Sequence, residues 1–168
     1  MAISTVIKTK ADGTIRLEDG TSPTPNDFTI AYEAGDLSIT VPHKSVSNFL
    51  DRGAMPGTPS LRYNEDQPIT FSFTCNFRDL SDASYVTMSE ILLQSGAVGS
   101  GWVSTLGANA EVFCVSLTWT VEGTDHGDAS DHSLTLPHCV VTGAWSEGEP
   151  NTISITGTSY AVLPTSIT

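Results

Sequence analysis

Apolar and polar residues alternate strictly in several stretches of the chain, most clearly over residues 69–77. The odd-numbered positions there are Ile, Phe or Cys, and the even-numbered positions are Thr, Ser or Asn. A period of two with one apolar face and one hydroxyl face predicts an antiparallel strand that is buried on one side. The same alternation over 111–122 and 152–158 predicts two more strands of this kind.

Shorter apolar runs between turn signals predict the rest of the β-structure. A Gly-Asp pair at 35–36 predicts that 27–33 and 37–41 form a hairpin, and Pro137 predicts a bend between 133–136 and 139–145. The remaining strand is expected at 14–18, between two Asp-Gly pairs.

A single helix is predicted at about 82–95. Ser81 or Asp82 can cap its start, because their side-chain oxygens accept hydrogen bonds from the free N–H groups of the first turn. Its apolar residues share one helical face, and Gly96 can end it at the position where glycine adopts the left-handed conformation at little cost. The residues of that face are Tyr85, Met88, Ile91 and Leu92. Residues 96–110 are expected to form a loop of small residues.

About eight short strands and one helix predict a mainly β fold, an antiparallel sandwich or barrel with one flanking helix. A length of 168 residues fits a single domain over 1–168. An N-terminal arm is expected at 1–26, a long inter-strand loop at 42–68 and a C-terminal tail at 160–168.

The segment 42–68 is too long for a hairpin turn and contains four prolines and two glycines. Long loops of this kind are usually functional or disordered, but this one keeps several apolar residues. We therefore consider two interpretations: a surface loop packed on its own domain, or an arm that contacts another copy. The apolar and basic content favours the arm, and its expected interface residues are Phe49, Leu50, Asp51, Arg52, Met55, Arg62 and Tyr63.

Charge is distributed unevenly along the chain. The net charge is −12, and all seven Lys and Arg residues lie within the first 78 positions. A basic surface for gripping nucleic acid is therefore not expected. Acidity of this size fits either simple solubility or a surface that must not bind a polyanion. Ser and Thr make up a quarter of the chain, which suits exposed β-structure.

No motif for catalysis or cofactor binding is present: there is no Gly-x-Ser-x-Gly elbow, phosphate-binding loop or dinucleotide fingerprint. The loop 125–132, Asp-His-Gly-Asp-Ala-Ser-Asp-His, could hold a metal, but its spacing matches no ligand signature, and a solvated turn is the favoured interpretation. Cys75, Cys114 and Cys139 are expected to be free buried thiols. We expect no enzymatic activity, metal or cofactor.

The N-terminal sequence has no signal-peptide pattern, and no apolar run reaches the roughly 18 residues that a membrane span needs. We therefore expect folding in a reducing cytoplasm, with no contact to a membrane.

A long loop with Leu50-Asp-Arg-Gly53 leads into Leu61-Arg62 and an acidic turn at 64–68. The Phe-rich strand 69–77, Arg78-Asp79-Leu80, one helix and Thr-rich strands follow. This order, over most of the chain, resembles that of the major tail tube proteins of long-tailed bacteriophages. The resemblance implies a β-sandwich whose six copies form a ring, with rings that stack into a tube.

The same resemblance implies the partners and the location. Further copies of the chain would be bridged by the long loop and the terminal arms, around a tape measure protein and between tail terminator and tip proteins. Genomic DNA would pass through the lumen without specific binding. The protein would reside in the virion tail and assemble in the host cytoplasm.

The candidates for the lumen surface are the hydroxyl faces of 69–77, 113–121 and 152–158. An alternative function is a carbohydrate- or protein-binding β-sandwich module, in which Trp102 or Trp145 would be a stacking platform.

Overall fold

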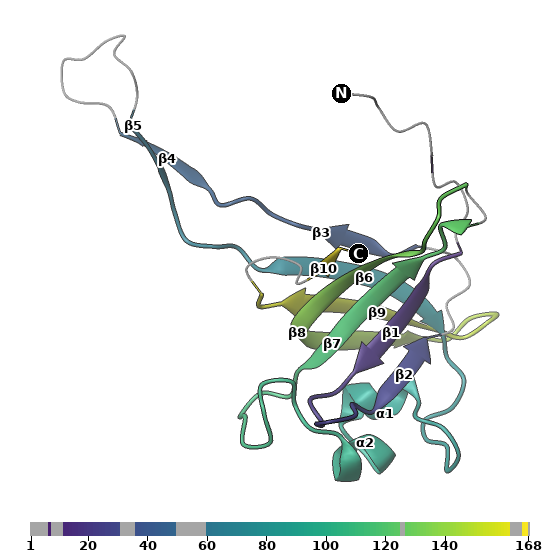
Figure 1. Ribbon diagram of the computed structural model, residues 1–168. Helices are drawn as coiled ribbons and strands as arrows, with labels where there is room; N and C mark the ends of the chain where they lie inside the picture. The colour runs from purple at the N-terminus through teal and green to yellow at the C-terminus, as the bar shows by residue number, and fades with distance from the viewer. Residues whose placement is uncertain are drawn as a thin grey trace.

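The computed structural model describes residues 7, 12–30, 36–49, 60–124, 127–161 and 166–167. Within these ranges the chain is mainly β, with two short helices (Figure 1). The strands are β1 Thr14–Glu18, β2 Asp27–Ile30, β3 Ser38–Thr40, β4 Val46–Phe49, β5 Ser60–Tyr63, β6 Ile69–Asn76, β7 Val115–Val121, β8 His132–Ser146, β9 Thr152–Ser159 and β10 Ser166–Ile167. The helices are α1 Met88–Leu93 and α2 Gly96–Gly101.

The main sheet is antiparallel and follows the order β2-β1-β7-β8-β9-β6-β3, with β10 added to β8. This arrangement confirms the predicted fold class. The two described helices lie together near β2, at one end of the sheet (Figure 1). Neither is long and apolar enough to cross a membrane.

Strand β8 gives the sheet its bend. Its first residues pair with β7, and the residues from Cys139 onward pair with β9. Between the two parts the register with β7 shifts, and His138 has a positive φ of 52°. Pro137 has no N–H to donate, and its carbonyl accepts a 2.6 Å hydrogen bond from the Ser159 hydroxyl. The predicted bend at Pro137 is thus confirmed, and it lets one strand serve two halves of the sheet.

The core lies between these halves and against the helices. Four of its residues are completely buried: Ile15, Leu17, Leu117 and Leu136. They belong to one apolar cluster with the alternating buried residues of β6 and β9. The pattern along β6 repeats buried and less buried residues at every step, as predicted. All three cysteines are buried free thiols, which confirms that expectation.

The prediction of one helix at about 82–95 is wrong, because the structure has two helices in this region and the first of them begins later than expected. Helix α1 begins after Thr87, whose hydroxyl accepts from the Glu90 N–H at 3.2 Å, while the Glu90 carboxylate accepts from the Thr87 N–H at 3.0 Å. Gln94, with a left-handed φ of 48°, ends it. The Glu90 carboxylate also accepts from the Ala97 N–H at 3.1 Å. Residues predicted as a small-residue loop therefore form α2.

Two predicted pairings also differ from the structure. Strand β2 pairs with β1, and β3 pairs with β6, so the expected hairpin of 27–33 with 37–41 does not form. Strand β1 lies between β2 and β7 in the interior of the sheet. The strand at 14–18 is confirmed, but it belongs to the sheet and not to an arm.

Candidate assembly surfaces

The outer face of one half of the sheet is rich in hydroxyl groups, and its strand residues carry no charge. Its positions follow from the cross-strand register, which places Thr70 beside Thr158 and Ser72 beside Thr156. We call it the hydroxyl face and define it by Ser38, Thr40, Thr70, Ser72, Thr74, Asn76, Val140, Thr142, Ala144, Ser146, Thr152, Ser154, Thr156 and Thr158. None of these residues is ionisable, and one carboxylate lies at the margin of the face, where Asp36 accepts a 3.1 Å hydrogen bond from the Thr74 N–H.

Two features mark the hydroxyl face: a contact between hydroxyl groups of neighbouring strands and a shallow depression. The Thr142 and Thr156 hydroxyls lie 2.9 Å apart across β8 and β9. A shallow depression of about 490 Å³ lies over the same strands, with Tyr160 at its border. Threonine suits such a surface because its branched side chain favours strands and its hydroxyl needs no counter-charge.

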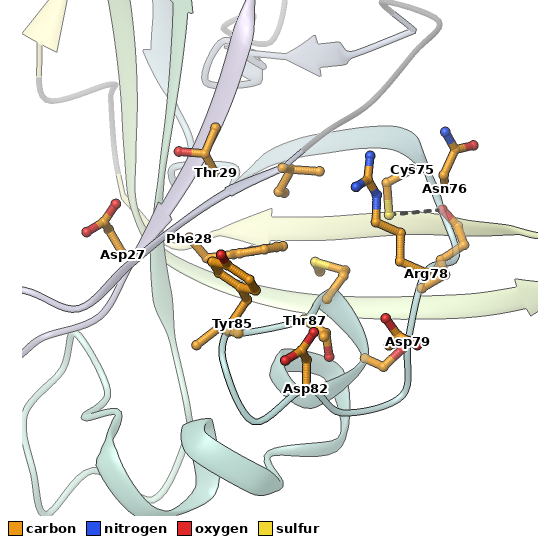
Figure 2. Close-up of a pocket in the computed structure, with 15 residues that line it drawn as sticks. Asp27, Phe28, Thr29, Cys75, Asn76, Arg78, Asp79, Asp82, Tyr85 and Thr87 are labelled. Carbon is orange, nitrogen blue, oxygen red and sulfur yellow. Dashed lines mark hydrogen bonds between the residues drawn. The ribbon is translucent and has the colours of Figure 1, made fainter.

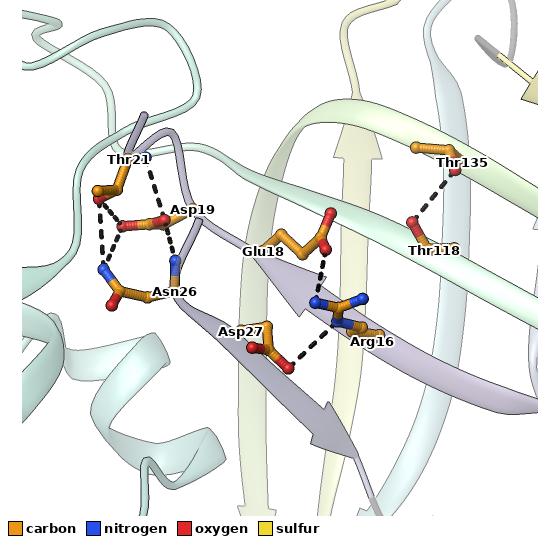
Figure 3. A network of polar contacts seen from close by, with 8 residues as sticks. All are labelled: Arg16, Glu18, Asp19, Thr21, Asn26, Asp27, Thr118 and Thr135. Atoms are coloured by element: carbon orange, nitrogen blue, oxygen red, sulfur yellow. Dashed lines mark hydrogen bonds and ion pairs between the residues drawn. The ribbon is translucent and has the colours of Figure 1, made fainter. Parts of the chain in front are cut away.

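The outer face of the other half differs because it carries charge. Arg16 on β1 contacts Glu18 at 3.0 Å and Asp27 at 3.2 Å (Figure 3). Thr118 and Thr135 lie 3.1 Å apart on the neighbouring strands. Of the three predicted hydroxyl faces, those of β6 and β9 are adjacent, whereas that of β7 belongs to this charged half.

A buried carboxylate fixes the turn between β1 and β2. Asp19 is 4% exposed and accepts hydrogen bonds from the N–H and side chain of both Thr21 and Asn26, at 2.6–3.1 Å (Figure 3). It also accepts from the Val103 N–H at 3.0 Å. Burial alone would raise the pKa of Asp19, but these hydrogen bonds hold its pKa below the usual value. The turn is thereby tied to the segment after α2.

Burial also determines the chemistry of the thiols. It raises the pKa of Cys75 to about 11 and that of Cys139 to about 12. The thiolate is the reactive form, so both side chains are poor nucleophiles at neutral pH.

The predicted loop 42–68 contains a two-stranded hairpin, which was not expected. Strands β4 and β5 pair with each other in a small sheet apart from the main one and project beyond it (Figure 1). Asn64 holds the base through its N–H to the Ser45 carbonyl and its side chain to Ser45 and Ser47, at 2.9–3.0 Å. The Lys44 ammonium pairs with Asp66 at 2.9 Å. We call Val46–Phe49 and Ser60–Tyr63 the hairpin arm.

One face of the hairpin arm presents three apolar residues. Val46 and Tyr63 are cross-strand partners, and Leu61, two residues before Tyr63, lies on the same face opposite Asn48. Their exposed fractions are 53%, 76% and 62%. Arg62 lies on the opposite face, beside Ser47.

Two of the seven predicted interface residues, Arg62 and Tyr63, therefore lie on β5, and Phe49 is the last residue of β4. Leu50, Asp51, Arg52 and Met55 lie outside the described residues.

The sequence did not suggest a cavity, but the structure has one of about 530 Å³ between β2, the end of β6 and the segment that leads into α1 (Figure 2). Phe28, Val86 and Met88 supply apolar wall, and Tyr85, which is 76% exposed, stands at the mouth. The charged residues that line it are Asp27, Arg78, Asp79 and Asp82. Three acids against one base give the cavity a negative balance.

The other candidate sites are the loop 125–132 and the two tryptophans Trp102 and Trp145. In the loop 125–132, His132 contacts Asp128 at 2.6 Å; Asp125 and His126 lie outside the described residues. The described residues hold no group of three or more metal-ligating side chains. Trp102 is half-buried against the core, and the Trp145 N–H donates to the Ser89 hydroxyl at 3.3 Å. The Trp102 ring is thus engaged by the core, whereas Trp145 is 41% exposed, so a stacking role for its ring stays a prediction.

The chain matches no protein-family model and no curated protein sequence. A solved structure shares its fold: a chain of the anti-feeding prophage baseplate, determined by cryo-EM and symmetrised six-fold. The similarity covers 96% of this chain and 94% of that chain, with a TM-score of 0.52 and 13% sequence identity. The likeness shows a common fold along nearly the whole length of both chains.

Proposed function

We propose that this protein is a structural component of a phage-tail-like particle and, more specifically, a tail tube protein. The observation that carries the proposal is the fold shared over almost the full length with a chain of the six-fold symmetrised anti-feeding prophage baseplate. The chain would form hexameric rings that stack into a tube, with no enzymatic activity.

Two surfaces support the tube assignment. The hydroxyl face would line the lumen, because an uncharged wall offers DNA no cation to hold its phosphates. The hairpin arm would reach a neighbouring copy, because none of the described residues covers Val46, Leu61 and Tyr63. Further partners would be a tape measure protein and the terminator and tip proteins of the tail, in a virion assembled in the host cytoplasm.

Self-assembly is tested with the purified full chain, by negative-stain microscopy and sedimentation over a range of protein and salt concentrations. We expect rings or tubes with six-fold symmetry. A variant that lacks residues 46–62 is expected to remain folded by circular dichroism but to stay monomeric. A strictly monomeric parent chain under every condition would overturn the proposal.

The lumen assignment has a test of its own. A cysteine introduced by Thr156→Cys lies on the hydroxyl face, while the three native thiols are buried. In assembled tubes we expect labelling by a small maleimide and exclusion of a bulky polymer-linked maleimide. In the variant without residues 46–62 both reagents should react. Equal labelling by the bulky reagent in intact tubes would show that this face is not luminal.

A further inference from the structure

The hairpin arm needs an apolar partner to be stable. A lone two-stranded hairpin is marginally stable in water, and this one exposes more than half of Val46, Leu61 and Tyr63. Single exposed apolar residues are ordinary, but three on one face of one ribbon form a patch that marks an interaction site. No residue in the described part of the chain covers that face, and its occupant is expected to be apolar in part.

The cavity beside β2 complements the hairpin arm, because it has an apolar wall and acidic side chains. Its wall contains Phe28, Val86 and Met88, and its volume of about 530 Å³ is in the range of roughly 300–1,000 Å³ that holds a small ligand. Such a space can take one or two large side chains, while the backbone of a ribbon stays outside. Asp79 and Asp82 line it, and no described residue forms an ion pair with either carboxylate.

Arg62 is the basic group of the described hairpin arm, and no described residue pairs with it. Its side chain leaves the ribbon on the face opposite Tyr63. Strand β5 is an edge strand of a two-stranded sheet, so the long arginine side chain can fold around that edge and reach carboxylates at the rim when Tyr63 enters the cavity. Charge pairs at such a rim steer association and fix its register.

Position favours a contact between different copies. The hairpin arm joins the main sheet at the first residue of β6, whereas the cavity lies at the other end of that strand, where Cys75 and Asn76 line it (Figures 1 and 2). A projecting group at one end and a receptor at the opposite end give a head-to-tail contact, which continues from copy to copy.

We propose that the cavity beside β2 is the receptor for the hairpin arm of another copy of this chain. Tyr63 and Leu61 enter the apolar part, and Arg62 pairs with Asp79 and Asp82. This proposal rests on the proposed function, because it requires self-assembly, and it names the two surfaces that meet.

Charge reversal tests the pairing. Arg62→Asp and the double variant Asp79→Arg/Asp82→Arg are each expected to raise the protein concentration needed for assembly at least tenfold. Combining all three substitutions should restore assembly toward that of the parent chain. Glu147→Arg/Glu149→Arg, in the exposed β8–β9 turn, makes the same change in net charge as the double variant and should assemble like the parent. Circular dichroism verifies that every variant is folded.

A cross-link provides the second measurement. Tyr63→Cys combined with Tyr85→Cys should give a ladder of linked copies with a short bis-maleimide, and neither single variant should give more than a dimer. A parent chain that assembles while the reversals have no effect, or while the combination fails to rescue, would overturn the receptor assignment alone. A parent chain that never assembles would overturn the proposed function itself.

Discussion

Strand β6 of the main sheet and strand β5 of the hairpin arm use the same alternation of apolar and polar residues with opposite results. On β6, Ile69, Phe71 and Phe73 are 1–3% exposed, because they lie within the apolar core and other core residues cover them. On the arm, Leu61 and Tyr63 remain more than half exposed. The apolar surface of the sheet is used in folding, whereas that of the arm is left for association. Substitutions in the two regions should therefore separate stability from assembly.

The largest effect on stability is expected for Phe71→Ala. The ring is 3% exposed and stacks on Phe73 at a centroid distance of 6.4 Å. Removing it deletes buried apolar surface and leaves a cavity, which should lower the free energy of unfolding by about 4 kcal/mol. Denaturant titration monitored by circular dichroism measures this. A loss below about 1 kcal/mol would contradict the assignment of Phe71 to the core.

Asp19→Ala is expected to cost about 2 kcal/mol, because it leaves partly buried backbone donors of Asn26 and Val103 without their acceptor. Since the pKa of Asp19 is lowered in the folded state, its contribution is present above the unfolded-state pKa and is lost as the pH falls through the folded-state pKa. The acid-side loss of stability should therefore be shallower in the variant than in the parent. Asp79→Ala, at an exposed site, is the control; equal effects of the two variants would refute this role.

Gly157→Ala should destabilise by about 2 kcal/mol, because a Cβ there would overlap the Phe71 ring. Combining it with Phe71→Leu should recover part of the loss, since the smaller side chain makes room. Thermal or denaturant unfolding of the four proteins in the cycle measures the coupling. Strict additivity would indicate that the two sites do not touch.

The smallest effect on stability is expected for Tyr63→Ser, within about 0.5 kcal/mol, because the side chain is already exposed. Assembly, in contrast, should be lost in sedimentation experiments. A large loss of monomer stability would show that the arm packs on its own domain, which is the other interpretation of the segment 42–68.

Local patterns predicted the strands well and their partners poorly. The alternation in β6, β9 and the later part of 111–122 reports burial on one side, a property that each strand carries in its own residues. Which strands pair depends on contacts far apart in the sequence, so β1–β2 and β3–β6 were missed. The bend at Pro137 was predictable because proline removes a donor locally.

The helix start and the candidate surfaces show the same limit. Ser81 and Asp82 looked like caps, but the Thr87–Glu90 capping box lies later and was a detectable signal. The short alternation over 60–63 could have indicated one strand of the hairpin arm, whereas Val-Ser-Asn-Phe over 46–49 does not alternate, and four prolines in 42–68 argued against a strand. The cavity had no signal in the sequence, because β2, β6 and the segment before α1 meet only in three dimensions.

The attachment of the hairpin arm has a mechanical consequence. Strand β4 continues from β3, strand β5 leads into β6, and β6 is paired with β9 at all eight of its residues. A pull on the arm therefore reaches the body at the end of a strand that is bonded to its neighbour along its whole length. Movement of β6 along its axis would break these pairs together and not one after another. The arm is thus anchored in shear, the geometry in which a pair of strands best resists tension.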